Sequence, residues 1–234
     1  SLSNNAVDVG YLSHDTWDLV ETEERSAHEI SRARDRRYIL LKKIGHGSTS
    51  SVYKARLEGA EGFIAIKKLR PELSYSNEFI ESFVKQTQRA STLAHPNIVQ
   101  ILDVGMFGEE VFLSMEYVPG VDLRRVFKLF RHADVGMNEQ HVALIGLNVA
   151  RALAHAHERT RRDEEARGAD YFVPMHGDLS PENILISNEG RVRVTNFFNA
   201  RAKRRVACKL GTDYLSRKMS HQAPEQLQKG RADE

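Results

Sequence analysis

Short apolar runs rich in β-branched residues alternate with glycine and small polar residues from residue 38 onward. Glycine and small polar residues join the runs "YILLKKIG" and "SSVYKARL", which predicts a β-hairpin. "GFIAIKKL" predicts a third strand, and "IVQILDVGMFGEEVFLSMEYV" predicts two more with a turn at "FGEE". The pattern therefore predicts five strands in the first half of the chain.

Apolar residues recur at helical spacing in two other stretches. Residues 76–94 form one of them, and we expect this helix to end before His95-Pro96, because the residue before a proline avoids the α region. Residues 138–158 place apolar side chains on one face, which we interpret as a core or interface face. These side chains are Val142, Ile145, Val149 and Leu153. Strands followed by helices predict an α+β fold in two lobes.

Residues 1–37 show neither the short β-branched runs of the strands nor the helical spacing of apolar residues. They are acidic at first ("HDTWDLVETEE") and basic later ("SRARDRR"), and they contain the only tryptophan, Trp17. We interpret them as an N-terminal extension outside the main fold. It is either a loosely attached tail or an arm that docks on this chain or on a partner.

Composition narrows the class of protein. The chain of 234 residues is 41% hydrophobic and 28% charged, which is enough apolar material for one large domain or two small lobes. A net charge of +2 gives no strong attraction to nucleic acid or anionic membranes, and the single cysteine, Cys208, excludes an internal disulfide framework. No signal peptide is recognised, and the apolar run 142–150 is too short to span a bilayer. We therefore expect a soluble, cytoplasmic protein.

Two features of the first half carry candidate chemistry. "GHGSTSSV" places Gly45 and Gly47 between two strands, where backbone amides can face phosphate oxygens. A tight hairpin that binds no ligand is the alternative interpretation of this sequence. Lys67 follows Ala65 and Ile66 on the third strand, and burying a lysine there is costly unless it faces an anion. An ordinary surface lysine is the alternative.

The order of the motifs resembles that of a eukaryotic-type (Hanks-type) serine/threonine protein kinase of the bacterial kind. The glycine-rich hairpin, "AIK", a helix, "HPNIV", "MEYV", "HGDLSPENIL" and "APEQ" follow one another as in that family, over residues 38–234. The resemblance implies a two-lobed protein-kinase-like fold, with a five-stranded antiparallel N-lobe at residues 38–118. It also implies a helical C-lobe at residues 119–234, which we expect to be incomplete because the sequence given stops soon after "APEQ".

The resemblance implies a site for ATP and a divalent metal ion. Asp178 would accept the proton of a substrate hydroxyl, Lys67 would contact the α and β phosphates, and Asn183 would bind Mg²⁺ or Mn²⁺. The residues implied to bind the nucleotide are Gly45, Gly47, Val52, Ala65, Lys67, Met115, Glu116, Val118, Asp122 and Leu185.

Three positions depart from the family pattern. Asn196 stands where the family's Asp-Phe-Gly triplet has its metal-binding aspartate, and a neutral amide oxygen binds Mg²⁺ less well than a carboxylate. Phe198 replaces the glycine of the same triplet. Gln86 stands where a glutamate of the following helix would pair with Lys67. We therefore expect metal binding by Asn183 and Asn196 to be weak or lost.

These departures predict a catalytically impaired pseudokinase that acts as a scaffold or regulator, with weak or absent nucleotide binding. A divergent active serine/threonine kinase is the alternative, because Lys67, Asp178 and Asn183 are all present. A small-molecule phosphotransferase also has a loop that begins "HGDL", but "HPNIV" and "APEQ" are typical of protein kinases.

We expect the partner to be a protein. The candidate surfaces are the apolar helix face around residues 138–158, which would mediate self-association, and the N-terminal extension. Residues 201–209 ("RAKRRVACK") are a solvated loop or a docking patch for an acidic partner, and no aromatic platform beside them indicates nucleic acid binding. His155 and His157 point to different helix faces and form no metal pair, and His176 is expected to be a packed structural residue.

Overall fold

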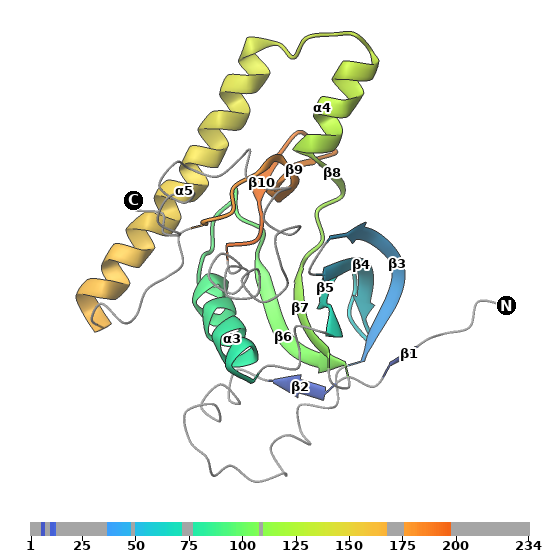
Figure 1. Cartoon of the computed structure of the whole chain (residues 1–234), viewed down its shortest axis with the longest axis vertical. Helices are drawn as coiled ribbons and strands as arrows, with labels where there is room; N and C mark the ends of the chain where they lie inside the picture. Colours follow the sequence, from blue (N-terminus) through green and yellow to red (C-terminus); the bar gives the residue numbers. More distant parts are fainter. Residues whose placement is uncertain are drawn as a thin grey trace, which may run out of the picture. The chain divides into compact units, whose positions relative to one another are not determined.

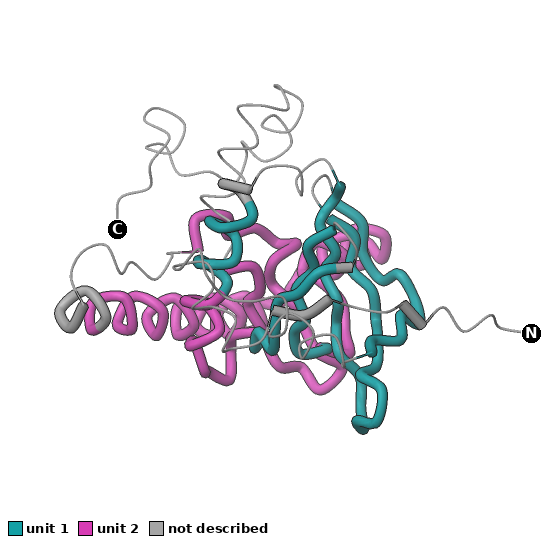
Figure 2. Tube along the Cα trace, turned by 90° about the horizontal axis from the view of Figure 1, so that it is seen from below, with its two compact units in different colours: residues 1–87, 100–117 teal, residues 88–99, 118–234 magenta. Residues whose placement is uncertain are grey.

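The computed structural model describes residues 37–47, 50–71, 77–107, 110–167 and 176–197, and the backbone of residues 6–7 and 10–12. The expectations for Trp17, Phe198, Cys208, residues 201–209 and "APEQ" concern residues outside these ranges. The chain divides into two compact units, residues 1–87 with 100–117 and residues 88–99 with 118–234 (Figure 2).

The first unit contains an antiparallel sheet whose central strands are the five predicted from the sequence (Figure 1). They are β3 (Tyr38–His46), β4 (Ser50–Leu57), β5 (Ile64–Leu69), β6 (Ile101–Phe107) and β7 (Glu110–Glu116), in the spatial order β3-β4-β5-β7-β6. The five-stranded antiparallel sheet is therefore confirmed. Between β5 and β6 lies α3 (Asn77–Ser91), which ends earlier than expected because the amides of Thr92 and Leu93 donate to carbonyls three residues back.

Two short strands from the N-terminal extension pair with the outer edges of this sheet. β1 (Ala6–Val7) pairs with β3, and β2 (Gly10–Leu12) pairs with β6, both antiparallel. Only two residues separate β1 from β2, and three Cα–Cα steps span at most about 11 Å. Val7 at the end of β1 and Gly10 at the start of β2 therefore lie within that reach of each other. We call the two short strands, residues 6–7 and 10–12, the edge strap.

A compact apolar cluster fills one face of the sheet. It contains Tyr38, Ala55, Ile66 and Phe112, each at most 2% exposed, and the rings of Tyr38 and Phe112 meet edge to face at 5.4 Å. Leu40, Leu57 and Ile64 pack against the cluster. Because side chains alternate between the two faces of a strand, Lys67, the neighbour of Ile66, belongs to the opposite face.

The described part of the second unit combines two α-helices with a small antiparallel sheet. The helices are α4 (Leu123–His132) and α5 (Glu139–Arg167), and a short 3₁₀ helix, η3, spans Pro181–Asn183. The strands are β8 (Gly120–Asp122), β9 (Ile184–Ser187) and β10 (Val192–Val194), in the order β10-β9-β8. A Cβ at Gly120 would lie 2.0 Å from the Ile186 carbonyl oxygen, so the approach of β8 to β9 requires glycine.

The "HPN" segment belongs to the second unit because it bonds there. The Asn97 side-chain amide donates to the Val192 carbonyl at 2.9 Å and to Asn148 Oδ1 on α5 at 3.0 Å. The His95 ring stacks on His155 of α5 at 5.0 Å. This explains why residues 88–99 group with the second unit, an arrangement that the strand and helix pattern alone did not predict.

The apolar face expected on α5 is only partly covered. Val149 is buried, and Ile145 and Leu153 are half-buried. Val142, by contrast, is 53% exposed, and Leu144 and Leu147 are similarly exposed. None of the helices in the described ranges is long and apolar enough to cross a lipid bilayer.

Candidate functional site

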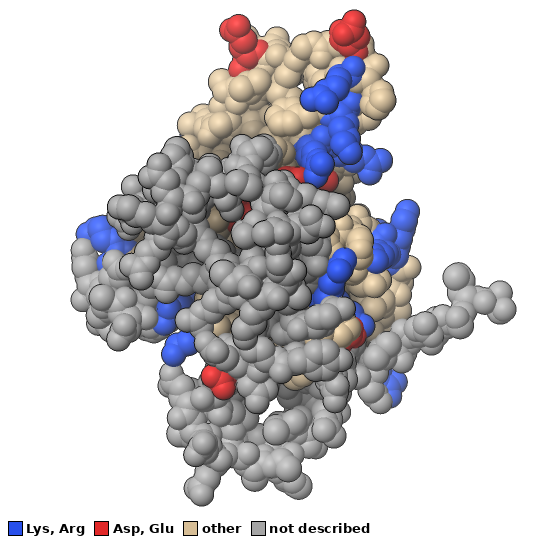
Figure 3. Space-filling view, viewed as in Figure 1, with Lys and Arg blue, Asp and Glu red and all other residues tan. Residues whose placement is uncertain are grey.

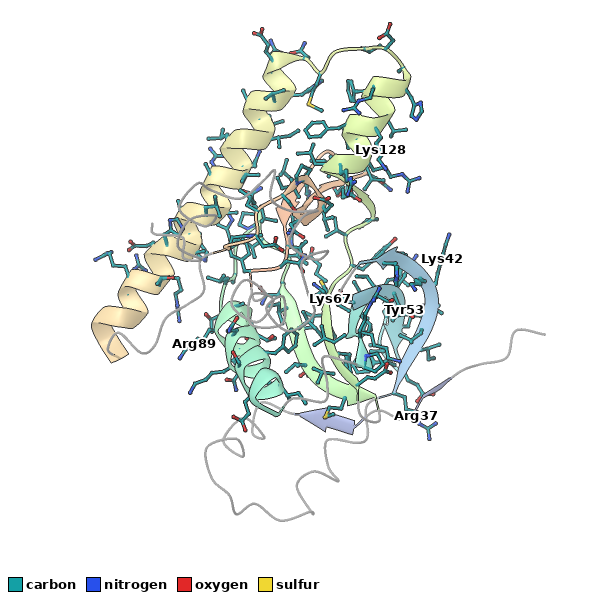
Figure 4. The ribbon with its side chains drawn as sticks, viewed as in Figure 1. Arg37, Lys42, Tyr53, Lys67, Arg89 and Lys128 are labelled. Atoms are coloured by element: carbon teal, nitrogen blue, oxygen red, sulfur yellow. The ribbon has the colours of Figure 1, made fainter. Side chains whose placement is uncertain are left out.

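The strand pairing of the first unit buries Lys67 in the middle of the sheet. Lys67 lies on β5 between Val52 of β4 and Leu113 of β7, and it is only 5% exposed (Figure 4). Its neighbour Lys68 points to the other face and forms an ion pair with Glu110. The alternative of two ordinary surface lysines is therefore wrong for Lys67. A lysine buried to this extent requires an anionic or polar environment.

The two glycines of the hairpin are not required by the backbone. A Cβ at Gly45 would lie 3.5 Å from the nearest Val52 atom, and one at Gly47 would lie 3.8 Å from the Ser50 carbonyl oxygen, which are ordinary contacts. Neither glycine has a positive φ. Gly47 donates to the Ser50 carbonyl at 2.8 Å, and Arg70 donates to the Gly47 carbonyl at 3.1 Å. The described backbone therefore tolerates a side chain at both positions.

Two of the residues implied to bind the nucleotide pair across adjacent strands of the first unit. Ala65 of β5 pairs with Met115 of β7, and both are 6% exposed. The Glu116 amide donates to the Gln100 carbonyl at 2.9 Å. Val118 makes no backbone–backbone hydrogen bond with another residue of the described ranges. Its amide and carbonyl therefore suit a ligand that both donates and accepts.

Gln86 on α3 leaves a polar atom unsatisfied. Its side chain is 9% exposed, and Nε2 donates to Ser82 Oγ at 3.0 Å. Within the part of the chain that the structure describes, Gln86 Oε1 has no hydrogen-bond partner. A buried amide oxygen without a partner is uncommon and costly. A glutamine at this position therefore costs stability without supplying the negative charge of a glutamate.

The loop before η3 in the second unit is braced by His176. His176 is 3% exposed, its Nε2 donates to the Thr195 carbonyl at 2.8 Å, and its Nδ1 accepts from the Asp178 amide at 3.3 Å. Both ring nitrogens are thus bound to the backbone, and the prediction of a packed structural histidine is confirmed. Gly177 has φ +57°, a left-handed conformation that suits glycine, and it turns the chain so that Asp178 follows the brace.

Asn183 has one allowed amide orientation. Its Nδ2 donates to the Asp178 carbonyl oxygen at 2.6 Å, and a carbonyl can only accept, so Oδ1 must lie on the other side. Asn196 Nδ2 donates to that Oδ1 at 2.5 Å. Asn196 has φ +74°, in the left-handed region that asparagine tolerates better than most residues. The two side chains implied to bind metal are therefore hydrogen-bonded to each other.

The side chains around Asn183 determine whether Mg²⁺ could bind there. Mg²⁺ prefers charged oxygen ligands in octahedral geometry. The Asp178 carboxylate accepts from Asn183 Nδ2 at 3.4 Å, and an amide N–H group of Asn196 faces Asn183 Oδ1. No group of three or more His, Cys, Asp or Glu side chains that could hold a metal occurs in the described residues. As arranged here, the site does not fit Mg²⁺.

Asp122 and Leu185 lie opposite each other on β8 and β9. Both are among the residues that the resemblance implies to bind the nucleotide. Asp122 Oδ1 accepts from the Arg125 amide at 2.8 Å, so Asp122 is also the N-cap of α4. The sequence contained this signal, because aspartate is a preferred residue immediately before a helix. The bracing roles of Asn97 and Thr195 had no comparable local signal.

The strand order of the first unit, the helices of the second and the braced loop define a protein-kinase-like fold. A family model described as "Protein kinase domain" matches residues 38–234. The chain therefore belongs to the protein kinase domain family.

The relatives include bacterial kinases. The chain is 32% identical, over 81% of its length, to the tyrosine-protein kinase MasK of Myxococcus xanthus, and 34% identical, over 69%, to the serine/threonine-protein kinase PrkC of Bacillus subtilis. It spans 29% and 22% of those two proteins. Among solved structures, the kinase domain of Mycobacterium tuberculosis PknI matches with a TM-score of 0.56 and 26% identity, over 68% of this chain and 57% of that one.

Proposed function

We propose that this kinase domain is impaired in metal-dependent phosphotransfer and acts mainly as a scaffold or regulator. The observation that carries the proposal is the hydrogen bond from Asn196 Nδ2 to Asn183 Oδ1. If a cation were bound, the side-chain oxygens of residues 183 and 196 would hold it. Here Asn183 Oδ1 instead accepts from an amide N–H group.

The chemistry of residue 196 explains the consequence. An aspartate there would set a negative oxygen against Asn183 Oδ1, and the two would repel each other unless a cation lay between them. Asn196 removes the repulsion by donating a proton, so the arrangement is stable without metal. If losing the metal costs about 3–4 kcal/mol of transition-state stabilisation, phosphotransfer slows by two to three decades.

Gln86 supports the same proposal from the first unit. A neutral amide cannot neutralise Lys67, and its Oε1 is buried without a partner. A loss of charge complementarity in both units fits a domain that no longer depends on rapid transfer.

Weak ATP binding remains part of the proposal. Buried Lys67 and the two sterically unnecessary glycines suit a polyphosphate, and Val118 suits an adenine edge. We expect ATP to bind with little dependence on Mg²⁺ or Mn²⁺.

An active kinase is the second candidate. The brace of His176 and the bond from Asn183 to the Asp178 carbonyl hold the catalytic loop in an ordered form. The relatives are named as kinases, one for tyrosine and one for serine/threonine, so their names assign no single acceptor hydroxyl.

Thermal melts with ATP, in EDTA, Mg²⁺ or Mn²⁺, distinguish the two candidates. A ligand at about 100 times its dissociation constant adds roughly 2.7 kcal/mol, which raises Tm by several degrees. We expect the same modest shift in EDTA and in Mg²⁺ for the unmodified protein, and a metal-dependent shift for Asn196→Asp.

A phosphotransfer assay completes the test. Asp178→Asn is the control, because it removes the proposed base. Transfer by the unmodified protein that requires metal and is lost in Asp178→Asn would establish the active kinase and overturn the proposal. The double variant Asn196→Asp with Gln86→Glu is expected to gain transfer over the unmodified protein.

A further inference from the structure

The exposed side of α4 carries charge of one sign. Half of its ten residues are basic (Arg124, Arg125, Lys128, Arg131 and His132), and none is acidic. In Figure 3, Lys and Arg side chains gather over this helix. Solvated helix surfaces normally mix both signs, so a single-sign face has to be accounted for.

Helix geometry places these charges opposite the buried side. At about 100° per residue, Leu123, Val126 and Phe130 fall within a stripe of about 60°, and Leu123 is buried while the other two are half-buried. The five basic residues occupy an arc of about 120° centred almost opposite this stripe. All five are exposed. We call this arc the α4 basic face.

Two exposed apolar side chains border the α4 basic face. Phe127 is 42% exposed and Leu129 is 57% exposed. On the helical wheel each lies about 40° outside one edge of the arc. The surface is therefore a charged centre with an apolar border on each side.

Among the described residues, two carboxylates bond to α4. Arg124 forms an ion pair with Glu182 at 2.6 Å, and the Asp122 carboxylate caps the helix. Asp134 is exposed just beyond the C-terminal end. Arg125, Lys128 and Arg131 take part in no recorded ion pair with another described residue. Arg124 and Arg125 also lie in the first turn, where the helix dipole disfavours positive charge.

We propose that the α4 basic face is a docking surface for an acidic segment of a partner protein. The ten-residue helix is about 15 Å long, which about five residues of extended chain can span. The occupant is therefore a short run with three or more carboxylates, flanked by apolar residues that contact Phe127 and Leu129. A bilayer would require the apolar groups at the centre of the face and the charges at its edges, the reverse of this arrangement.

The proposal does not depend on whether phosphotransfer persists, because no α4 side chain on this face belongs to the nucleotide or metal positions. Its test accordingly needs no nucleotide. A failure of docking would leave the proposed loss of metal dependence untouched, and the reverse also holds.

The test measures the fluorescence anisotropy of a labelled peptide with alternating glutamate and leucine, about ten residues long, mixed with the full chain. The same peptide with glutamine in place of glutamate is the uncharged probe. We expect only the acidic peptide to bind, and its affinity to fall roughly tenfold from ~50 to ~300 mM NaCl, because exposed charges are screened by salt.

A matched pair of variants distinguishes binding at the α4 basic face from attraction by the net charge of the chain. Arg125→Glu, Lys128→Glu and Arg131→Glu together should weaken binding at least about tenfold. Lys42→Glu, Lys43→Glu and Lys85→Glu make the same change in net charge at exposed positions of the first unit and should leave binding within about twofold. Replacing the three α4 residues by glutamine gives a milder variant if the charge reversal prevents folding.

Three outcomes would overturn the proposal. The first is equal loss in both triple variants, which would indicate attraction by net charge alone. The second is no binding of the acidic peptide at low salt. The third is α4-dependent binding to vesicles containing phosphatidylserine, or to single-stranded DNA, with no binding of the peptide.

Discussion

Asn183 shows how one hydrogen bond decides the chemistry of its neighbour. Because the Asp178 carbonyl can only accept, the Asn183 amide group must face it, and Asn183 Oδ1 must face residue 196. The side chain at position 196 can then face Asn183 Oδ1 in two ways. It either donates a hydrogen bond to this oxygen, or it is negatively charged and a cation lies between the two oxygens. Asn196 supplies the donor.

Replacing Asn196 by aspartate should therefore make stability depend on metal. In EDTA, Asn196→Asp loses a hydrogen bond and sets two oxygens together, which we expect to cost about 1–3 kcal/mol and to lower Tm by several degrees. Adding Mg²⁺ should restore much of the loss. Asn196→Gly tolerates the same backbone and removes the side chain, so it should be destabilised without responding to Mg²⁺. An equal response of both variants would contradict this account.

Asp103 on β6 provides a pH-dependent contribution to the stability of the first unit. Burial raises the pKa of its carboxyl from the ordinary 3.8 to about 7, against the opposing effect of the Val104 amide, which donates to Oδ1 at 2.7 Å. The folded state therefore holds the proton more tightly than the unfolded state. This contribution is favourable at low pH and is lost as pH rises from about 4 through about 7.

Asp103→Asn isolates that contribution. Asparagine retains an oxygen for the Val104 amide and does not titrate. We expect the Tm of the unmodified protein to fall relative to that of Asp103→Asn between pH 5 and pH 8, as measured by thermal melts of both proteins at each pH. Two parallel pH profiles would show that Asp103 does not titrate in this range.

At the scale of elements, the edge strap joins the two ends of one sheet. An unpaired edge exposes backbone N–H and C=O groups that can pair with another chain. β1 and β2 occupy one edge each, along Tyr38–Ile39 and Val104–Met106. The strap thus stabilises the sheet and shields it from edge-to-edge association.

Removal of residues 1–12 tests this role. We expect faster amide hydrogen exchange at residues 104–106 and a loss of about 1–3 kcal/mol of stability, because several backbone hydrogen bonds disappear. A shorter truncation of residues 1–4 leaves both strands and is the matched control. Unchanged exchange in the longer truncation would mean that the strap does not pair in solution.

At the scale of the whole molecule, the two compact units carry different parts of the kinase pattern. Lys67, Gln86 and the glycine hairpin belong to the first unit, and Asp178, Asn183 and Asn196 belong to the second. The second unit also carries the exposed apolar residues of α5, which we propose as a self-association surface.

Sedimentation velocity over a range of protein concentrations tests that surface. We expect the average mass to rise with concentration, and Leu144→Glu with Leu147→Glu to abolish the rise by placing charges on the apolar surface. Gln140→Glu with His141→Glu adds two acidic side chains to the exposed start of the same helix and should leave association unchanged. A monomer at every concentration would rule this surface out.

Much of the fold could be predicted from the sequence because its signals are local. Five strands and two helices follow from apolar spacing, and the ordered motifs located Lys67, Asp178 and Asn183. The edge strap could not be predicted, because strands of two and three residues carry no readable period. The exposure of Val142 could not be predicted from the sequence, because it depends on which segments pack against α5.

The sequence by itself determined which side chains are available, including the absence of a carboxylate at residue 196 and the single-sign charge of residues 123–132. Only the tertiary structure decided that Asn196 donates to Asn183, thirteen residues away, and that the charges of α4 lie opposite its buried stripe. The physical reason is the range of the interactions. Propensity and periodicity act over a few neighbouring residues, whereas hydrogen-bond direction and burial depend on segments that only folding brings together.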